Sequence, residues 1–266
     1  MKIPFTKAHG ARNDFLLTWR EDLPSGLGDY AKAARAICER NTGAGADGWL
    51  LITRSPVGDG ADCAIDLWNS DGSRSEISGN GTRCAAALMI ENCHAGPRVR
   101  ISTGAGVKEL ALLERDGLRF SFEMNMGRAQ VEELHANIEG RDAIILNVGN
   151  PQCAIIVDDF DFDWPALGAR VERLARFPNR TNVSFVRVID RHTLDVRFFE
   201  RGAGMTMSSG TGSTGAAAAA AARGLVESPV EVLTPAGPLS IRWIGGEMYL
   251  SGPAEIVATG EFYCIG

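Results

Sequence analysis

A matched pair of glycine-rich segments constrains the fold of this chain more than any other feature. The segments occupy residues 78–87 and 209–218, and both follow the pattern S-G-x-G-[ST]-x-x-A-A-A. Their first serines lie 131 residues apart, which is about half of the 266-residue chain. A segment that recurs at this spacing indicates two similar structural units rather than one continuous core. The sequence therefore predicts a duplicated fold.

The order of the other elements repeats in the same way. Apolar residues recur at helical spacing in residues 29–40 and 164–177, and each of these helices precedes several strand-like runs and then a glycine-rich turn. Many short strands with few helices favour an α+β fold. We predict two pseudo-symmetric halves, residues 1–127 and 128–266, each an antiparallel sheet wrapped around the helix that follows its turn. The last strand of the chain is free to pack back on the first half.

Composition narrows the range of partners. The net charge of −6 and the absence of a basic run argue against nucleic acid, and no apolar run of about 18 residues predicts a membrane span. The six cysteines form no metal-ligand spacing with the four histidines, so no metal site is expected. Their predicted state is buried and reduced, in a cytoplasmic protein without a signal peptide. The assembly state is left open, a homodimer included.

The paired turns point to a small anion. A glycine-rich turn that opens a helix exposes unpaired backbone N–H groups at the positive end of the helix dipole. Two such turns, at Gly79 and Gly210, suit one small anionic ligand held at the junction of the two halves. The G-x-G-x-x-G pattern at 43–48 lies between a helix and a strand, the reverse of the order in dinucleotide-binding folds, and is dismissed as a nucleotide motif.

Polar residues next to the turns suggest which anion. Several asparagines and one Glu-Arg pair stand at strand ends, namely Asn13, Asn69, Asn150, Asn182 and Glu200 with Arg201. Amides and a guanidinium group bind a carboxylate, and a glutamate binds an ammonium group. The expected ligand is therefore a zwitterionic amino acid.

These motifs, taken in order, resemble the diaminopimelate epimerase family within the proline racemase and phenazine-biosynthesis isomerase fold group. The matching motifs run from end to end of the chain: H-G-x-x-N-D-F at 9–15, G-x-G-A-D-G at 43–48, N-x-D-G-S at 69–73, G-N-G-x-R at 79–83, G-N-P at 149–151, E-R-G-x-G at 200–204 and G-x-G at 210–212. The resemblance implies a cofactor-independent isomerase that interconverts LL- and meso-diaminopimelate in lysine and peptidoglycan biosynthesis.

The resemblance also assigns roles to residues. In the family, each half supplies one catalytic cysteine at the start of a central helix; one thiolate removes the α-proton and the other thiol returns a proton to the opposite face. Ser78 and Ser209 occupy these two catalytic positions here. The implied substrate-binding residues are Asn13, Asn69, Gly79, Asn80, Asn150, Asn182, Glu200, Arg201, Gly210 and Thr211.

Four positions depart from the family pattern. Serines replace both cysteines, Gln152 replaces the usual histidine and Met205 replaces a glutamate. A serine hydroxyl is a far weaker acid than a thiol, and each pKa unit costs about 1.4 kcal/mol of ionisation. Three explanations stay open: an epimerase in which Glu200 or Glu76 supplies the basicity, a diverged isomerase or amino-acid-binding protein with lost or altered chemistry, and an engineered double Cys→Ser variant.

Overall fold

The computed structural model describes residues 1–54 and 60–264, which group into two compact units. The first unit consists of residues 1–124 and 252–266, and the second of residues 125–251. Within the described ranges, no helix is long and apolar enough to cross a membrane.

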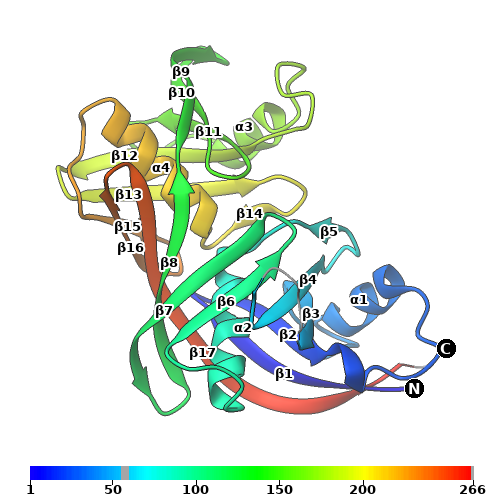
Figure 1. Ribbon diagram of the computed structural model, residues 1–266. Coiled ribbons are helices and arrows are strands. Elements are labelled where there is room, and N and C mark those ends of the chain that lie inside the picture. The colour runs from blue at the N-terminus through cyan, green and yellow to red at the C-terminus, as the bar shows by residue number, and fades with distance from the viewer. Residues whose placement is uncertain (55–59, 265–266) are drawn as a thin grey trace. The chain divides into compact units, whose positions relative to one another are not determined.

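The first unit contains two α-helices and most of the first eight strands, shown from blue to green in Figure 1. Its elements are β1 (Lys2–Gly10), β2 (Asn13–Trp19), the 3-10 turn η1 (Arg20–Asp22), α1 (Tyr30–Cys38), β3 (Gly48–Arg54), β4 (Cys63–Asn69), β5 (Arg74–Ser75), α2 (Gly79–Glu91), β6 (Arg98–Thr103), β7 (Gly106–Asp116) and β8 (Arg119–Arg128).

The second unit follows, with β8 leading into it and the long last strand leading out of it. Its elements are β9 (Gln130–Ile138), β10 (Arg141–Asn147), β11 (Pro151–Ile156), α3 (Trp164–Val171), β12 (Asn182–Asp190), β13 (Thr193–Glu200), β14 (Gly204–Thr206), α4 (Gly210–Ala222), β15 (Val230–Thr234) and β16 (Gly237–Ile244). The last strand, β17 (Glu247–Tyr263), begins in this unit and belongs to the first unit from residue 252 onward.

Strand pairing is mixed in both units, so the predicted antiparallel sheets are wrong in this respect. In the first unit β2 pairs parallel with β3 and β4 with β6; in the second, β11 pairs parallel with β12 and β13 with β15. In each case an α-helix lies between the paired strands in the chain. Such a crossover returns the chain to the same end of the sheet, so the next strand runs in the same direction. The remaining pairs are antiparallel, and the sequence of pairings in the first unit recurs in the second.

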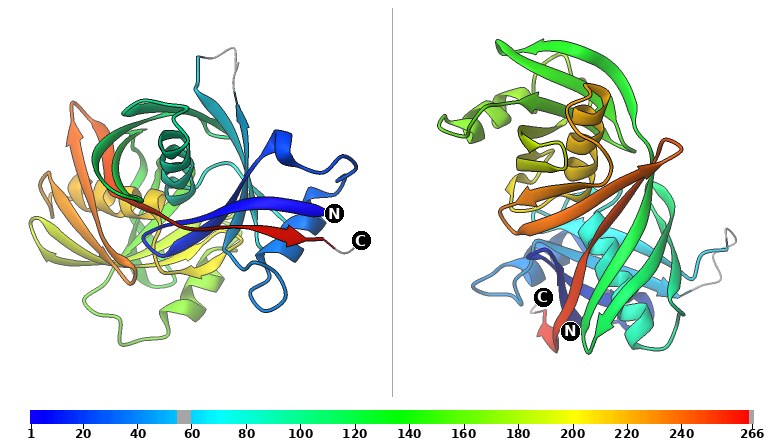
Figure 2. Two further views of the ribbon diagram at one scale, coloured as in Figure 1. Left: turned by 90° about the horizontal axis from the view of Figure 1, so that it is seen from below. Right: turned by 90° about the vertical axis from the view of Figure 1, so that its left-hand side faces the viewer.

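The helices that follow the glycine-rich turns are buried on all sides. Residues 79–89 of α2 and residues 210–220 of α4 are buried throughout. Helix α2 contacts β1, β2, β3, β4 and β6 of its own unit (Figure 2), and α4 contacts β9 to β13, β15 and β16 of its own. A helix buried all round carries no polar face, and the small alanine and glycine side chains allow strands to approach it closely.

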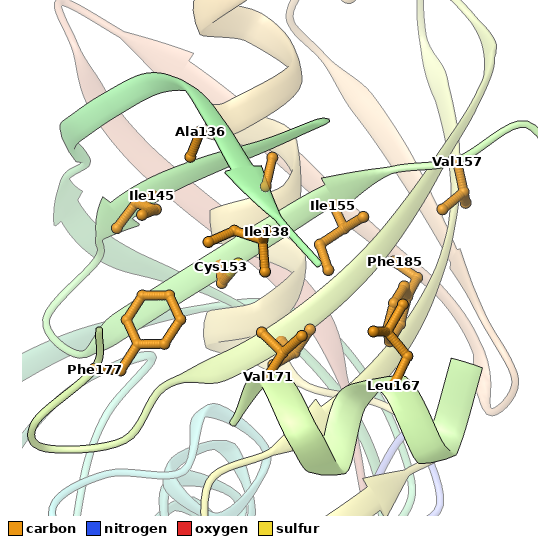
Figure 3. Packing of buried hydrophobic residues seen from close by; sticks show 12 residues of the cluster. Ala136, Ile138, Ile145, Cys153, Ile155, Val157, Leu167, Val171, Phe177 and Phe185 are labelled. Carbon is orange, nitrogen blue, oxygen red and sulfur yellow. The ribbon is translucent and has the colours of Figure 1, made fainter. Parts of the chain in front are cut away.

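Helices α1 and α3 are amphipathic and cover the opposite faces of their sheets. In the first unit, Ala33, Ala34 and Ile37 of α1 pack with Trp49 and Leu51 of β3. In the second unit the corresponding cluster joins Leu167 and Val171 of α3 to side chains of β9, β10, β11 and β12 (Figure 3). Each helix begins at an aspartate cap: Asp29 accepts from Lys32 N at 2.9 Å and Asp163 from Ala166 N at 3.0 Å.

Strand β9 occupies most of residues 127–140, next to the predicted boundary at residues 127–128. Residues 130–135 of β9 are largely exposed on both faces, so no alternation of apolar and polar residues marks this strand in the sequence. Helices α2 and α4 begin at Gly79 and Gly210, so the glycines form the first helical turn itself.

Candidate active site

Ser78 caps the first buried helix. Its side-chain oxygen accepts from Gly81 N at 3.1 Å, and its carbonyl oxygen accepts from Thr82 N at 2.8 Å and from Thr82 Oγ1 at 2.7 Å. Ser, followed by small residues, is a preferred residue at this position because its oxygen satisfies one of the free N–H groups of the first turn. Ser78 is half-buried, and no acceptor for its hydroxyl proton is found among the described residues.

Two predicted site residues of the first unit meet beside this helix start. Asn80 Nδ2 donates to Asn13 Oδ1 at 3.2 Å, and Asn13 Nδ2 donates to Asp47 Oδ2 at 2.7 Å. Asn80 also accepts from the buried guanidinium group of Arg83. Asn69 is not joined to them: its side chain donates to Ser73 Oγ at 3.0 Å within the turn that follows β4.

Ser209 caps α4 in the same geometry. Its side-chain oxygen accepts from Gly212 N at 3.0 Å. Unlike Ser78, Ser209 is buried, and its hydroxyl donates to Glu200 Oε2 at 2.8 Å. The other carboxylate oxygen of Glu200 accepts from Thr206 Oγ1 at 2.6 Å. Two hydroxyl groups therefore hold one carboxylate against the second helix start.

The hairpin of β13 and β14 produces this contact. Glu200 is the last residue of β13 and pairs with Gly204 of β14, while Phe198 pairs with Thr206. The chain then turns back into α4, so the cap residue arrives beside the end of β13. A carboxylate that accepts a hydroxyl proton at this distance is placed to act as a base toward that hydroxyl.

The remaining predicted residues of the second unit form two short hydrogen-bonded groups. In one, Gln152 Nε2 donates to Asn150 Oδ1 at 2.7 Å, and Asn150 Nδ2 donates to Thr211 Oγ1 at 3.4 Å. In the other, Asn182 Nδ2 donates to Pro151 O at 3.0 Å and Asn182 Oδ1 accepts from Arg201 N at 3.0 Å. Asn150, Gln152 and Thr211 thus share one group at the start of α4, where the family pattern has a histidine in place of Gln152.

The cysteines near the two turns are not suited to catalysis. Cys84 lies in α2 and Cys153 in β11, and both are fully buried. Burial raises the pKa of each thiol to about 12, so neither supplies a thiolate at neutral pH. The described residues also contain no group of three or more His, Cys, Asp or Glu side chains that could hold a metal ion.

Sequence reasoning missed Asp47, Arg83 and Thr206, which contact the predicted set, and Glu172, which binds the backbone of the residue after Arg201. Asp47 lies in the motif at 43–48, which matches the family pattern but assigns no binding role to the aspartate. Glu172 is buried at the end of α3; its carboxylate accepts from Gly202 N at 3.1 Å, and from Arg173 and Arg180. Burial alone would raise the pKa of Glu172, but the hydrogen bonds from Arg180, Gly202 and Arg173 lower it. The carboxylate therefore stays charged and fixes the backbone just after Glu200 and Arg201.

Known structures of low sequence identity share the fold of this chain. A phenazine biosynthesis protein of Bacillus anthracis superposes with a TM-score of 0.74 at 14% identity, and the match covers all of both chains. A hydroxyproline epimerase of Agrobacterium vitis, solved with trans-4-hydroxy-L-proline, gives a TM-score of 0.72 at 16% identity and covers 98% of this chain and 92% of that one. At these identities the likeness concerns the fold alone.

Sequence relatives are much closer. The family model described as diaminopimelate epimerase matches residues 5–132 and 144–257. The diaminopimelate epimerase of Pelotomaculum thermopropionicum is 36% identical, with 97% of this chain and 98% of that protein covered. The diaminopimelate epimerase of Archaeoglobus fulgidus is 38% identical, with 98% and 96% covered. Since both the family model and these relatives match along nearly the whole chain, the chain belongs to the diaminopimelate epimerase family.

Proposed function

We propose that the chain is a cofactor-independent isomerase that inverts one α-carbon of diaminopimelate, interconverting the LL and meso forms in the cytoplasm for lysine and peptidoglycan synthesis. Family membership supports the substrate and the reaction. The observation that carries the chemistry is the hydrogen bond of 2.8 Å from Ser209 Oγ to Glu200 Oε2. It gives a serine at a family cysteine position a carboxylate that can take its proton.

The proposed reaction moves one proton at each serine. As the α-proton passes to Ser209 Oγ, the hydroxyl proton of Ser209 passes to Glu200 Oε2, and the electron pair of the C–H bond stays on the α-carbon. Ser78 Oγ then gives its proton to the opposite face of that carbon as a proton from solvent replaces it, and Glu200 releases its proton to solvent, which restores the starting state of both serines. The free N–H groups of the first turns of α2 and α4 stabilise the charge that develops on the substrate carboxylate.

Glu200 lowers the free-energy cost of proton transfer through Ser209 below that of a serine without an acceptor. A serine hydroxyl ionises far less readily than a thiol, and about 1.4 kcal/mol is lost for every pKa unit. A paired acceptor offsets part of this cost because no free alkoxide has to form; the proton moves as the new bond is made. A carboxylate has about four acceptor sites, so Glu200 can also hold the substrate ammonium group.

The remaining predicted residues bind the substrate in this proposal. Arg201 and the amides of Asn13, Asn69, Asn80, Asn150 and Asn182 bind carboxylates, and the backbone N–H groups at Gly79, Gly210 and Thr211 complete the sites at the helix starts. We also propose that the chain arose by duplication, each half a sheet wrapped around its buried helix with a boundary at residues 127–128. The repeated order of strand pairings and the equivalent caps at Ser78 and Ser209 support this.

The test is incubation with LL-diaminopimelate in D2O, with deuterium at the α-carbon and the meso isomer followed together. Inversion with one solvent deuterium, lost in both Ser78→Ala and Ser209→Ala, is the expected result. Exchange without inversion would point to one working base instead of two. If neither exchange nor inversion occurs while diaminopimelate still binds, the chain is a binding protein or acts on another amino acid.

A further inference from the structure

A directed chain of hydrogen bonds runs through the first unit and contains two of the proposed substrate-binding asparagines. It starts at Arg83, whose Nη2 donates to Asn80 Oδ1. Asn80 Nδ2 then donates to Asn13 Oδ1 at 3.2 Å, and Asn13 Nδ2 donates to Asp47 Oδ2 at 2.7 Å. Each amide accepts on its carbonyl side and donates on its nitrogen side.

The two ends of the chain fix this direction. An arginine side chain only donates hydrogen bonds, and an ionised aspartate only accepts them. A flipped Asn80 would turn its NH2 group toward Arg83, and a flipped Asn13 would turn its carbonyl oxygen toward Asp47. Either change sets two donors or two acceptors against one another, which costs the bond and leaves a desolvated polar group. Only one orientation of each amide satisfies both ends.

The donor end is held rigidly. Arg83, the fifth residue of α2, is fully buried, and its Nε donates to Pro253 O at 3.0 Å. A Cβ at Gly10 would lie 3.2 Å from Arg83 Nη2 and 3.1 Å from Pro253 O, so the backbone of β1 closes over the guanidinium group. Burial lowers the pKa of Arg83 to about 10, which leaves the group charged at neutral pH.

Asp47, the acceptor end of the hydrogen-bond chain, is held by an ion pair and by a backbone N–H group. Asp47 Oδ1 accepts from Arg40 Nη2 at 2.7 Å, and Asp47 Oδ2 accepts from Asp14 N at 3.1 Å as well as from Asn13. Asp14 in turn binds Arg40 and lies 3.1 Å from Lys7 Nζ. Burial alone would raise the pKa of Asp14, but hydrogen bonds from Arg40 and Lys7 lower it, so Asp14 keeps its charge.

We infer that Arg83 and Asp47 are positioning residues that hold the amides of Asn80 and Asn13 in one orientation for substrate binding. The bonds of the chain use one hydrogen on each amide nitrogen, so each amide presents its second N–H in a fixed direction. A pre-oriented donor loses less entropy when a carboxylate binds than one that is free to rotate. The inference rests on the proposed function, because it assigns both asparagines to the substrate.

The test compares Asp47→Ala with Asp66→Ala. Asp66 is a matched control because it accepts from two arginines, Arg20 and Arg74, in the same unit but has no bond to an asparagine of the site. In Asp47→Ala we expect KM for diaminopimelate to rise roughly tenfold, the effect of one lost hydrogen bond of ordinary strength. We expect kcat of Asp47→Ala to change by less than about threefold. In Asp47→Asn, which keeps one acceptor oxygen, we expect KM to return most of the way to the wild-type value.

A second measurement does not depend on turnover. In protein labelled with ¹⁵N-asparagine, the side-chain amide signals of both Asn13 and Asn80 should shift in Asp47→Ala and stay in place in Asp66→Ala. Asp47 reaches Asn80 only through Asn13, so movement of the Asn80 signal reports the hydrogen-bond chain itself. Unmoved Asn80 signals together with a KM equal to that of Asp66→Ala would overturn the inference. Wild-type protein that neither binds nor turns over diaminopimelate would refute the proposed function, and the amide signals would still decide whether the chain orients both side chains.

Discussion

Ser209 Oγ and Glu200 Oε2 lie 2.8 Å apart, in a hydrogen bond that joins the cap of α4 to the last residue of β13. Ser78, at the equivalent cap of α2, accepts from Gly81 N but has no hydroxyl acceptor among the described residues. The two helix starts are alike in backbone and differ in chemistry. The hydroxyl of Ser209 has a carboxylate that can take its proton, and the hydroxyl of Ser78 has none in the part of the chain that the structure describes.

This asymmetry predicts that Glu200 matters for proton transfer. Glu200→Gln should lower the rate of α-deuterium exchange by about 10² to 10⁴, the range for loss of a general base. Thr206→Val, which removes the second hydroxyl on the same carboxylate, should have a much smaller effect. Exchange is measured by mass spectrometry in D2O. Equal losses in the two variants would mean that Glu200 acts through local packing.

Restoring the family cysteines should accelerate the reaction. In Ser78→Cys/Ser209→Cys the thiols can ionise near neutral pH, because the N-terminus of a helix lowers a thiol pKa from about 8.5. We expect epimerisation to rise by at least about 10², since each pKa unit gained is worth about 1.4 kcal/mol. The rate is followed as conversion of LL to meso diaminopimelate. A double variant that binds diaminopimelate but is no faster than wild type would contradict the assigned substrate orientation.

Alkylation of the native protein should leave its activity intact. Cys84 and Cys153 are buried thiols whose pKa is raised to about 12, whereas Cys93 is exposed. We expect iodoacetamide at pH 8 to modify Cys93 and to spare the two buried thiols, because only the thiolate reacts. Peptide mapping identifies the modified sites. Cys264 is half-buried and is removed together with Cys93 in the control. Loss of activity on modification, persisting in Cys93→Ser/Cys264→Ser, would show that a buried thiol takes part after all.

The glycine that closes the second turn should tolerate no side chain. A Cβ on Gly212 would lie 2.8 Å from Phe198 Cδ1 and 2.9 Å from Ser209 Oγ. Gly212→Ala should therefore lower the free energy of unfolding by about 1–3 kcal/mol and reduce activity. The matched change Gly81→Ala should cost less, because its Cβ would meet the end of Leu50 at 3.2 Å. Urea unfolding measures the loss of stability in each variant. A larger loss in Gly81→Ala than in Gly212→Ala would contradict the close packing inferred at Gly212.

Stability in acid should depend on Glu172. Its pKa is lowered in the folded protein, so its contribution is present above the ordinary glutamate pKa and is lost as pH falls through the lowered value. Glu172→Gln should unfold about 2 kcal/mol more easily at pH 7, the scale of a hydrogen-bonded charge, and should lose less stability than wild type between pH 5 and pH 3. Glu133→Gln, which removes an exposed ion pair with Arg176, is the control and should change stability by less than about 0.5 kcal/mol. A parallel acid profile in Glu172→Gln and wild type would contradict this assignment.

The structure confirms helices in residues 29–40 and 164–177 and after each glycine-rich turn, features that depend on neighbouring residues. Ser78 and Ser209 cap helices because each side-chain oxygen reaches the N–H group three residues ahead. Asp29 and Asp163 begin amphipathic helices for the same reason. The family assignment was likewise available from the order of motifs, and the sequence relatives confirm it.

Contacts between distant residues depended on the tertiary structure. Asp47 reaches Asn13 because β2 and β3 pair in parallel with Phe15 opposite Gly48, which brings the first residue of β2 beside the residue just before β3. The sequence offered either Glu200 or Glu76 as the source of basicity. The β13–β14 hairpin places Glu200 in hydrogen-bond contact with Ser209. Periodicity reports only which side of an element is buried. The register of the strands is set by packing over the whole sheet, and it decides which polar groups face each other.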